Sequence, residues 1–280
     1  MDQQTASVPV ARHPDTLSAE QALALFTRPR RTPQTDDELA FLGQADHRHT
    51  VTHDGRRLAA WRWGSEGPRV LLVHGWESRA SHWSTLIGEL RQRGLQVVAF
   101  DAPAHGQSDG DSTNVVDIGR AALAVAAQLG PVDAVAGHSV GSAATLHALA
   151  QGLRVRASVH IAGPVSLRRV LEGFARMGRM DDGERQRFLR LVESRIGAPL
   201  DSMDLPALRS GLRHPGLILH DLKDPEVPYD ASVALRQAWP QATLLTVDGP
   251  GHRRIIRDSG VIGAISEFLV RTVSTGRASA

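Results

Sequence analysis

Cysteine is absent from this 280-residue sequence, and Lys223 is its only lysine. Without cysteine, the chain has no disulfide, no thiolate nucleophile and no cysteine ligand for a metal ion. No apolar run approaches the ~20 residues that a membrane-spanning helix needs. The first residues also lack the basic start and apolar stretch of a secretory signal. We therefore expect a cytoplasmic protein without a membrane span.

An excess of one charge is missing too. The 32 basic residues nearly balance the 30 acidic ones, and the arginines are dispersed, so no basic block is long enough to follow a phosphate backbone. This disfavours nucleic-acid binding. Hydrophobic residues make up 41% of the chain, which excludes a disordered protein, and its length is enough for one large α/β domain.

The hydrophobic pattern predicts an antiparallel strand pair followed by repeated strand–helix units. Residues 49–53 and 57–63 alternate around Asp54-Gly55, a typical hairpin turn. Helical patterns separate nearly continuous apolar runs, which are typical of strands buried on both faces of a parallel sheet. We predict an α/β fold whose mostly parallel, eight-stranded sheet has helices on both faces. The remaining strands are expected over 69–74, 96–100, 132–138, 157–161, 217–220 and 243–247.

Residues 1–48 are predicted to form an N-terminal helical extension, because Ser18 and Thr35 each begin a capping-box pattern after a loose arm that ends near residue 16. We expect this extension to pack against the main domain, rather than to cover a site or form an oligomer contact. Residues 273–280 are expected to form a C-terminal tail.

The strand–helix alternation breaks over residues 164–213, where only helical patches appear. An insertion of this length is uncommon as plain loop. We predict a small helical cap over the carboxyl ends of the strands, where open α/β sheets bind ligands. The core is then formed by residues 49–163 and 214–272. Met177 and Met180 are expected to pack within the cap.

A candidate nucleophile lies in Gly137-His138-Ser139-Val140-Gly141. A buried strand precedes this Gly-X-Ser-X-Gly motif and a helix of small residues follows it, which is the setting of a nucleophile elbow. A serine hydroxyl needs a base within hydrogen-bond reach, and an imidazole oriented by a carboxylate suits that task.

Position along the chain selects one base among the thirteen histidines. His252 follows the last predicted strand in a glycine–proline loop, and Asp224 follows the preceding strand. Both are expected at the edge of the sheet that carries Ser139, in the order Ser, Asp, His. Asp221 and Glu226 are the neighbouring alternatives to Asp224.

Taken together, the motifs resemble the α/β-hydrolase superfamily of the small serine esterase type. The resemblance covers about residues 50–272 and includes His74-Gly75-Trp76 and the stretch 101–108. It implies Ser139 as nucleophile, His252 as general base and Asp224 as the orienting acid. It also implies an oxyanion hole formed by the backbone N–H groups of Trp76 and Val140. The side chains of Trp76 and His138 are then expected in the substrate pocket, and His74, His105 and His138 are expected to position loops.

Three positions depart from the family pattern. Ala104 replaces a glycine in a structural turn, and Ser142 replaces a glycine after the elbow. Glu77 lies beside the expected oxyanion hole, where an ionised carboxylate would oppose negative charge. We therefore expect Glu77 to point to solvent or to pair with Arg79.

The resemblance implies a cofactor-independent serine hydrolase that cleaves carboxylic esters of small to medium hydrophobic acyl groups through an acyl-enzyme on Ser139. Acyl transfer, thioester or lactone cleavage, carbon–carbon hydrolysis and perhydrolysis use the same triad and stay open. A binding protein without turnover is the alternative of another class. The expected partner is a small-molecule ester, with a homodimer left open. No metal is expected, because no two histidines lie four positions apart in a predicted helix with an acidic neighbour, as a helical metal site requires.

Overall fold

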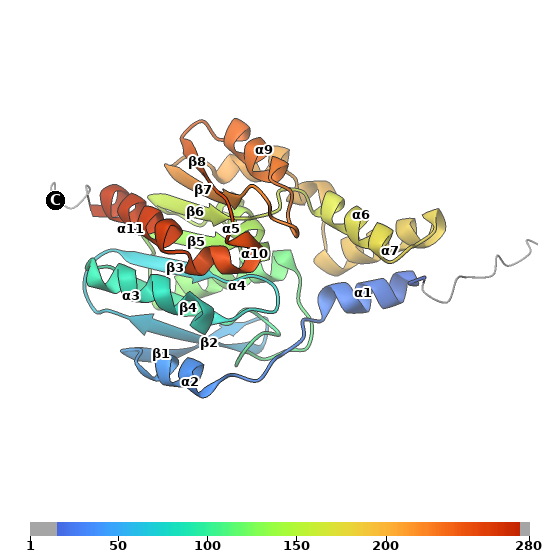
Figure 1. Cartoon of the computed structure of the whole chain (residues 1–280). Helices are drawn as coiled ribbons and strands as arrows, with labels where there is room; N and C mark the ends of the chain where they lie inside the picture. Colours follow the sequence, from blue (N-terminus) through green and yellow to red (C-terminus); the bar gives the residue numbers. More distant parts are fainter. Residues whose placement is uncertain (1–15, 275–280) are drawn as a thin grey trace, which may run out of the picture.

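An eight-stranded sheet runs through the computed structural model, which describes residues 16–274 (Figure 1). The strand order is β1-β2-β4-β3-β5-β6-β7-β8. β1 and β2 pair antiparallel, as do β2 and β4, and all other neighbours are parallel. This confirms the predicted fold class. The strands are β1 (His47–His53), β2 (Arg56–Trp63), β3 (Arg69–Val73), β4 (Gln96–Phe100), β5 (Ala134–His138), β6 (Ala157–Ile161), β7 (Gly216–Asp221) and β8 (Ala242–Val247).

Helices cover both faces of the sheet, so strand residues alternate between two apolar cores. In β3, Leu71 and Val73 enter the core beneath α4 (Val115–Leu129) and α5 (Val140–Ala150), together with α9 (Asp230–Ala238). Val70 and Leu72 enter the opposite core, beneath α3 (Ser84–Gln92) and α11 (Ser259–Ser274). Two short helices, α10 (Gly251–Arg254) and the 3₁₀ turn η4 (Ile255–Arg257), follow β8.

The insertion between β6 and β7 is helical, as predicted. It contains α6 (Leu167–Met177), α7 (Asp182–Ile196) and α8 (Leu205–Leu208), with 3₁₀ turns η2 (Leu200–Met203) and η3 (Arg209–Gly211). Met180 packs against the apolar core, but Met177 does not: it is 78% exposed at the end of α6. The expectation that both methionines pack in the cap was wrong for Met177.

The N-terminal extension divides into two parts with different roles. Its second helix, α2 (Asp36–Gly43), packs on the core as expected, with the ring of Phe41 stacked 5.3 Å from that of Trp63. Its first helix, α1 (Ala19–Thr27), lies instead beside α6 and α7 (Figure 1). The ring of Phe26 packs against those of Phe174 and Phe188 of the cap, at 5.5 and 6.0 Å. Plain packing on the main domain was therefore the wrong expectation for α1.

Two predicted boundaries shift slightly. β1 begins at His47, inside the range assigned to the extension. α11 continues to Ser274, because Val273 is fully buried in the second core, so no tail begins at residue 273. The predicted loose arm lies mainly in residues 1–15, outside the described part of the chain, as do residues 275–280. Among residues 16–274, no helix combines the length and the apolar character needed to cross a membrane.

Candidate active site

Ser139 stands at the sharp turn between β5 and α5. Its φ of 55° and ψ of −126° place it at positive φ, which residues other than glycine rarely adopt. A Cβ on Gly137 would lie 2.5 Å from the carbonyl oxygen of Gly141, and a Cβ on Gly141 would collide with the carbonyl oxygen of Val73. Only glycine fits at both flanking positions. The local sequence therefore builds the strained elbow that presents the serine hydroxyl.

Three side chains predicted from separate strand ends come together at this edge. Oγ of Ser139 lies 2.9 Å from Nε2 of His252, and Nδ1 of His252 lies 2.7 Å from Oδ2 of Asp224. An ionised carboxylate only accepts hydrogen bonds, so Nδ1 carries the proton and Nε2 is free to accept the serine proton. The arrangement can thus activate a hydroxyl as a nucleophile.

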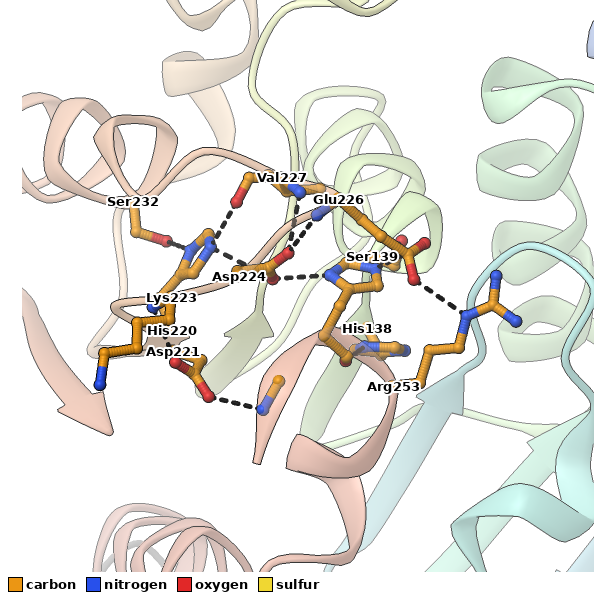
Figure 2. Close-up of polar contacts among 12 residues, drawn as sticks. His138, Ser139, His220, Asp221, Lys223, Asp224, Glu226, Val227, Ser232 and Arg253 are labelled. Carbon is orange, nitrogen blue, oxygen red and sulfur yellow. Dashed lines mark hydrogen bonds and ion pairs between the residues drawn. The ribbon is translucent and has the colours of Figure 1, made fainter. Parts of the chain in front are cut away.

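Asp224 is held as an anion by several donors (Figure 2). Its Oδ1 accepts hydrogen bonds from the N–H groups of Glu226 and Val227, at 2.8 and 2.9 Å. Burial raises the pKa of Asp224, but the hydrogen bonds from His220, His252 and these two N–H groups outweigh it and hold the pKa well below its usual range. A buried, ionised carboxylate at this place keeps the imidazole in one tautomer.

A second histidine, whose role the sequence analysis missed, also contacts Asp224. Nε2 of His220 lies 3.4 Å from Oδ2 of Asp224 and 2.9 Å from the carbonyl oxygen of Val227, and Nδ1 lies 2.6 Å from Oγ of Ser232. Figure 2 shows Asp224 between His220 and Ser139. The one signal for His220 was a polar residue ending an apolar strand four positions before Asp224.

The neighbouring carboxylate, Asp221, holds the backbone of the loop that carries His252. Its Oδ2 accepts hydrogen bonds from the N–H groups of Gly249 and Gly251, at 3.1 and 2.5 Å. The other alternative, Glu226, points to the rim, 4.0 Å from Nε2 of His252, and its Oε1 lies 2.9 Å from Nε of Arg253. Only Asp224 is therefore placed to orient the imidazole through Nδ1.

Two backbone segments border the space in front of Ser139. Val140 is the first residue of α5, and N–H groups in the first turn of a helix have no intrahelical acceptor. On the other side, a Cβ on Gly75 would lie 3.2 Å from Cβ of Ser139, so the segment leading to Trp76 passes close to the serine. Donation by Val140 and Trp76 to an oxyanion stays a prediction.

Glu77 does not pair with Arg79. It binds Arg30 instead, with Nε and Nη2 of Arg30 lying 2.9 and 2.8 Å from the two carboxylate oxygens. These hydrogen bonds are the main reason that the pKa of Glu77 is lowered. Arg79 reaches Thr32 and Glu38. The segment after α1 crosses the core beside Glu77, a contact across 47 positions that the local sequence pattern did not reveal.

The loop histidines act as backbone supports. Nε2 of His74 accepts the N–H of Ala102 at 2.9 Å, and Nε2 of His105 accepts the N–H of Glu77 at 3.1 Å. Nε2 of His138 donates to the carbonyl oxygen of His252 at 2.8 Å. Burial, with the neighbouring His252 adding to it, lowers the pKa of His138 to about 3, so this ring stays neutral. The expected loop-positioning role is confirmed for all three.

A cavity of about 350 Å³, called here the apolar cavity, opens in front of Ser139. The core contributes Trp76 and Val115, α1 contributes Leu25 and Phe26, and the cap contributes a further set of mostly apolar side chains. That set comprises Pro164, Ser166, Leu167, Val170, Phe174 and Met203. Cap and extension thus enclose the space beside the nucleophile.

A second cavity, of about 290 Å³, meets the first at Trp76, Ser139, Glu226 and His252. We call it the arginine cavity, because the residues after His252 line it with three arginines. These are Arg253, Arg254 and Arg257. His138, expected in the substrate pocket, lines this second cavity only.

One cluster elsewhere has the residue types of a metal site. Ligand atoms of His53, Asp54 and Asp117 lie within 4.8 Å of one another. Arg56 donates two hydrogen bonds to Asp117, at 3.0 and 2.7 Å, and so already supplies the positive charge that this carboxylate faces. The donor set therefore does not favour a cation.

Comparison with known proteins identifies the family and the fold. Residues 70–262 match the profile of the alpha/beta hydrolase family. The chain is 25% identical over 248 residues to a pimeloyl-[acyl-carrier protein] methyl ester esterase of Xanthomonas campestris pv. campestris (strain B100), covering 74% of this chain and 96% of that protein. It is 36% identical over 91 residues to a non-heme haloperoxidase of Rhodococcus erythropolis, covering 31% and 33%. The structure of Est1E from Butyrivibrio proteoclasticus with ferulic acid has the same fold, with a TM-score of 0.62 at 21% identity over 81% of this chain and 99% of that chain.

Proposed function

The chain belongs to the alpha/beta hydrolase family, and we propose that it cleaves carboxylic esters of small to medium hydrophobic acyl groups through an acyl-enzyme on Ser139. The observation that carries the proposal is the continuous hydrogen-bonded path from Ser139 through His252 to Asp224, with separations of 2.9 and 2.7 Å. The esterase named among the relatives supports the same reaction class.

In the proposed reaction, Ser139 Oγ attacks the ester carbonyl carbon while Nε2 of His252 takes its proton. Asp224 stabilises the resulting imidazolium, and the N–H groups of Val140 and Trp76 stabilise the oxyanion. The imidazolium then protonates the alcohol oxygen as the bond to carbon breaks. Water, deprotonated by His252, attacks the acyl-enzyme, and the imidazolium returns that proton to Oγ of Ser139 as the acid is released.

The lining of the apolar cavity sets the expected acyl group. Its walls are aliphatic and aromatic, and burial of each acyl methylene there contributes about 0.8 kcal/mol to binding. A volume of about 350 Å³ suits a short or medium chain or a single ring. Many of the side chains that line it come from α1 and the cap, so these two segments should set the acyl length that fits.

The test combines labelling and turnover. A fluorophosphonate probe should label Ser139, and 4-nitrophenyl esters of C2 to C12 acids should be hydrolysed with a maximum at short or medium length. Ser139→Ala should lower kcat by about 10⁴-fold or more and abolish labelling. Ser142→Ala is the matched control, because Ser142 lies three residues on and its hydroxyl bonds His160 at 3.0 Å.

Absence of both labelling and turnover would refute the proposal. Products formed with an added alcohol or hydrogen peroxide separate hydrolysis from transfer. Free acid as the main product supports hydrolysis, whereas a new ester or a peracid would assign acyl transfer or perhydrolysis.

A further inference from the structure

The two cavities that meet at Ser139 differ in chemistry. The apolar cavity is lined mainly by carbon atoms, whereas the lining of the arginine cavity includes three arginines and two carboxylates, Glu77 and Glu226. An ester bound at Ser139 has an acyl half and an alcohol half, which extend from the scissile bond in different directions. The molecule therefore offers unlike surroundings to the two halves of one substrate.

Pairing of charges leaves the arginine cavity positive. Glu226 is paired with Arg253 at 2.9 Å, and Glu77 with Arg30 at 2.8 Å (Figure 2 shows the first of these pairs). Within residues 16–274, no carboxylate oxygen lies within 4.0 Å of the guanidinium groups of Arg254 or Arg257. Nε of Arg254 donates only to the carbonyl oxygen of Pro250, at 3.1 Å.

The position of His252 decides which half of the substrate meets these two arginines. The leaving alcohol oxygen must receive its proton from Nε2 of His252, so the alcohol half lies on the side of that ring. His252 lines both cavities, whereas four of the residues that follow it line the arginine cavity alone: Arg253, Arg254, Ile256 and Arg257. The acyl half is then directed into the apolar cavity.

We infer that the arginine cavity binds an anionic group, a carboxylate or a phosphate, on the alcohol half of the ester, and that Arg254 and Arg257 are its recognition residues. The inference rests on the proposed ester hydrolysis and narrows its substrates to esters with an apolar acid and an acidic alcohol. Guanidinium groups suit both anions, because their N–H donors match carboxylate and phosphate oxygens.

The test uses butyrate esters that share one acyl-enzyme and differ only in the leaving group. 3-Carboxyphenyl butyrate carries the anion, and 3-carbamoylphenyl butyrate is its neutral counterpart of similar shape. A third ester, 3-(phosphonooxy)phenyl butyrate, distinguishes phosphate from carboxylate. The readout is the ratio of kcat/KM for the anionic ester to that for the neutral ester, at low and at high salt.

We expect the ratio to exceed one and to fall as salt is added, because exposed charges are screened. Arg254→Gln/Arg257→Gln should lower it about five- to tenfold, the effect of two exposed charge pairs. The control is Arg154→Gln/Arg213→Gln, which removes the same charge from exposed arginines that precede β6 and β7, at the opposite end of the strands. The control should leave the ratio unchanged.

A ratio at or below one, or equal changes in both double variants, would overturn the inference. A 4-nitrophenyl hemiglutarate, which carries its anion on the acyl half, should be hydrolysed more slowly than 4-nitrophenyl butyrate, and the reverse order would also overturn it. Turnover of the neutral ester reports separately on the proposed function: without it and without labelling of Ser139, ester hydrolysis itself fails.

Discussion

Oδ2 of Asp221 accepts a hydrogen bond at 2.5 Å from the N–H of Gly251, the residue directly before His252. The end of β7 and the loop that follows it thus supply two carboxylates with separate tasks. Asp221 fixes the backbone that carries the imidazole, and Asp224 contacts its ring. The distinction is invisible in the sequence, where the two residues lie three positions apart, and it predicts different consequences for their replacement.

Asp224→Asn should lower kcat for 4-nitrophenyl butyrate by about 10⁴-fold, because the amide no longer holds His252 in the required tautomer. Its free energy of unfolding should fall as well, because the N–H groups of Glu226 and Val227 lose a charged acceptor. Asp221→Asn should keep the ring contact but lower the free energy of unfolding by about 1–3 kcal/mol, since the N–H groups of Gly249 and Gly251 lose a charged, buried acceptor. Equal losses of kcat in the two variants would contradict this division.

His220→Gln tests whether the buried histidine positions Asp224. The substitution removes or alters the contacts of His220 with Asp224, Val227 and Ser232. We expect kcat to fall about tenfold, because residues that hold a functional side chain in position typically contribute at least that much. KM should stay unchanged, because His220 lines neither cavity. Ser232→Ala, which removes only the outer hydrogen bond, should have a smaller effect. A kcat at the wild-type value in His220→Gln would exclude the positioning role.

Phe26→Ala, in α1, should change the length of the acyl group that the protein prefers. Removing this ring enlarges the apolar cavity, so the ratio of kcat/KM for octanoate to butyrate esters should rise about tenfold, the effect of 1.4 kcal/mol. The control is Phe41→Ala, a half-buried phenylalanine of the same extension that stacks on Trp63 and does not line either cavity. If both variants shift the ratio equally, α1 does not set acyl length.

Histidines that are buried in the neutral form should lower the free energy of unfolding at acid pH. Burial lowers the pKa of His160 to about 3, with His214 adding to the shift, whereas an unfolded histidine titrates near 6.5. Below pH 6.5 the unfolded chain therefore binds more protons than the folded one, so stability falls as pH drops from 6.5 toward 3. His160 alone should contribute about 1.4 kcal/mol per pH unit to this slope.

Urea unfolding at pH 6, 5 and 4 measures the effect. His160→Gln should have a slope against pH that is smaller than that of the wild type by about 1.4 kcal/mol per unit. The comparison uses the difference between two proteins, so carboxylates that titrate in the same range cancel. Parallel slopes would show that His160 is protonated in the folded state.

The strands and the three converging side chains could be predicted because each is indicated by a pattern in a short stretch of sequence. β3, β4 and β5 read as continuous apolar runs, and Gly137 and Gly141 flank Ser139 at the positions where a side chain would collide. Strand ends in a parallel sheet share one edge, so His252 and Asp224 could be placed there without knowing any distance. These are properties of short stretches.

Contacts between distant stretches could not be predicted in the same way. The pair of Arg30 and Glu77 depends on the path of the segment after α1, and the place of α1 depends on the apolar face that the cap presents to Phe26. Both are outcomes of tertiary packing, which periodicity does not encode. The role of His220 was missed for a related reason, since a histidine inside an apolar run reads as one more core residue.

The apolar cavity is lined by residues from three parts of the chain: the core, the cap and α1. α1 is attached to the cap through its backbone, where the N–H of Ala19 donates to Oε2 of Glu184 at 2.6 Å. A change at this hydrogen bond would shift α1 and with it Leu25 and Phe26, which line the cavity, and so change which acyl groups fit. Ser139, His252 and Asp224 would stay fixed at the strand ends. The choice of acyl group and the transfer of the proton thus depend largely on different stretches of the chain, so evolution or engineering can alter the first with little effect on the second.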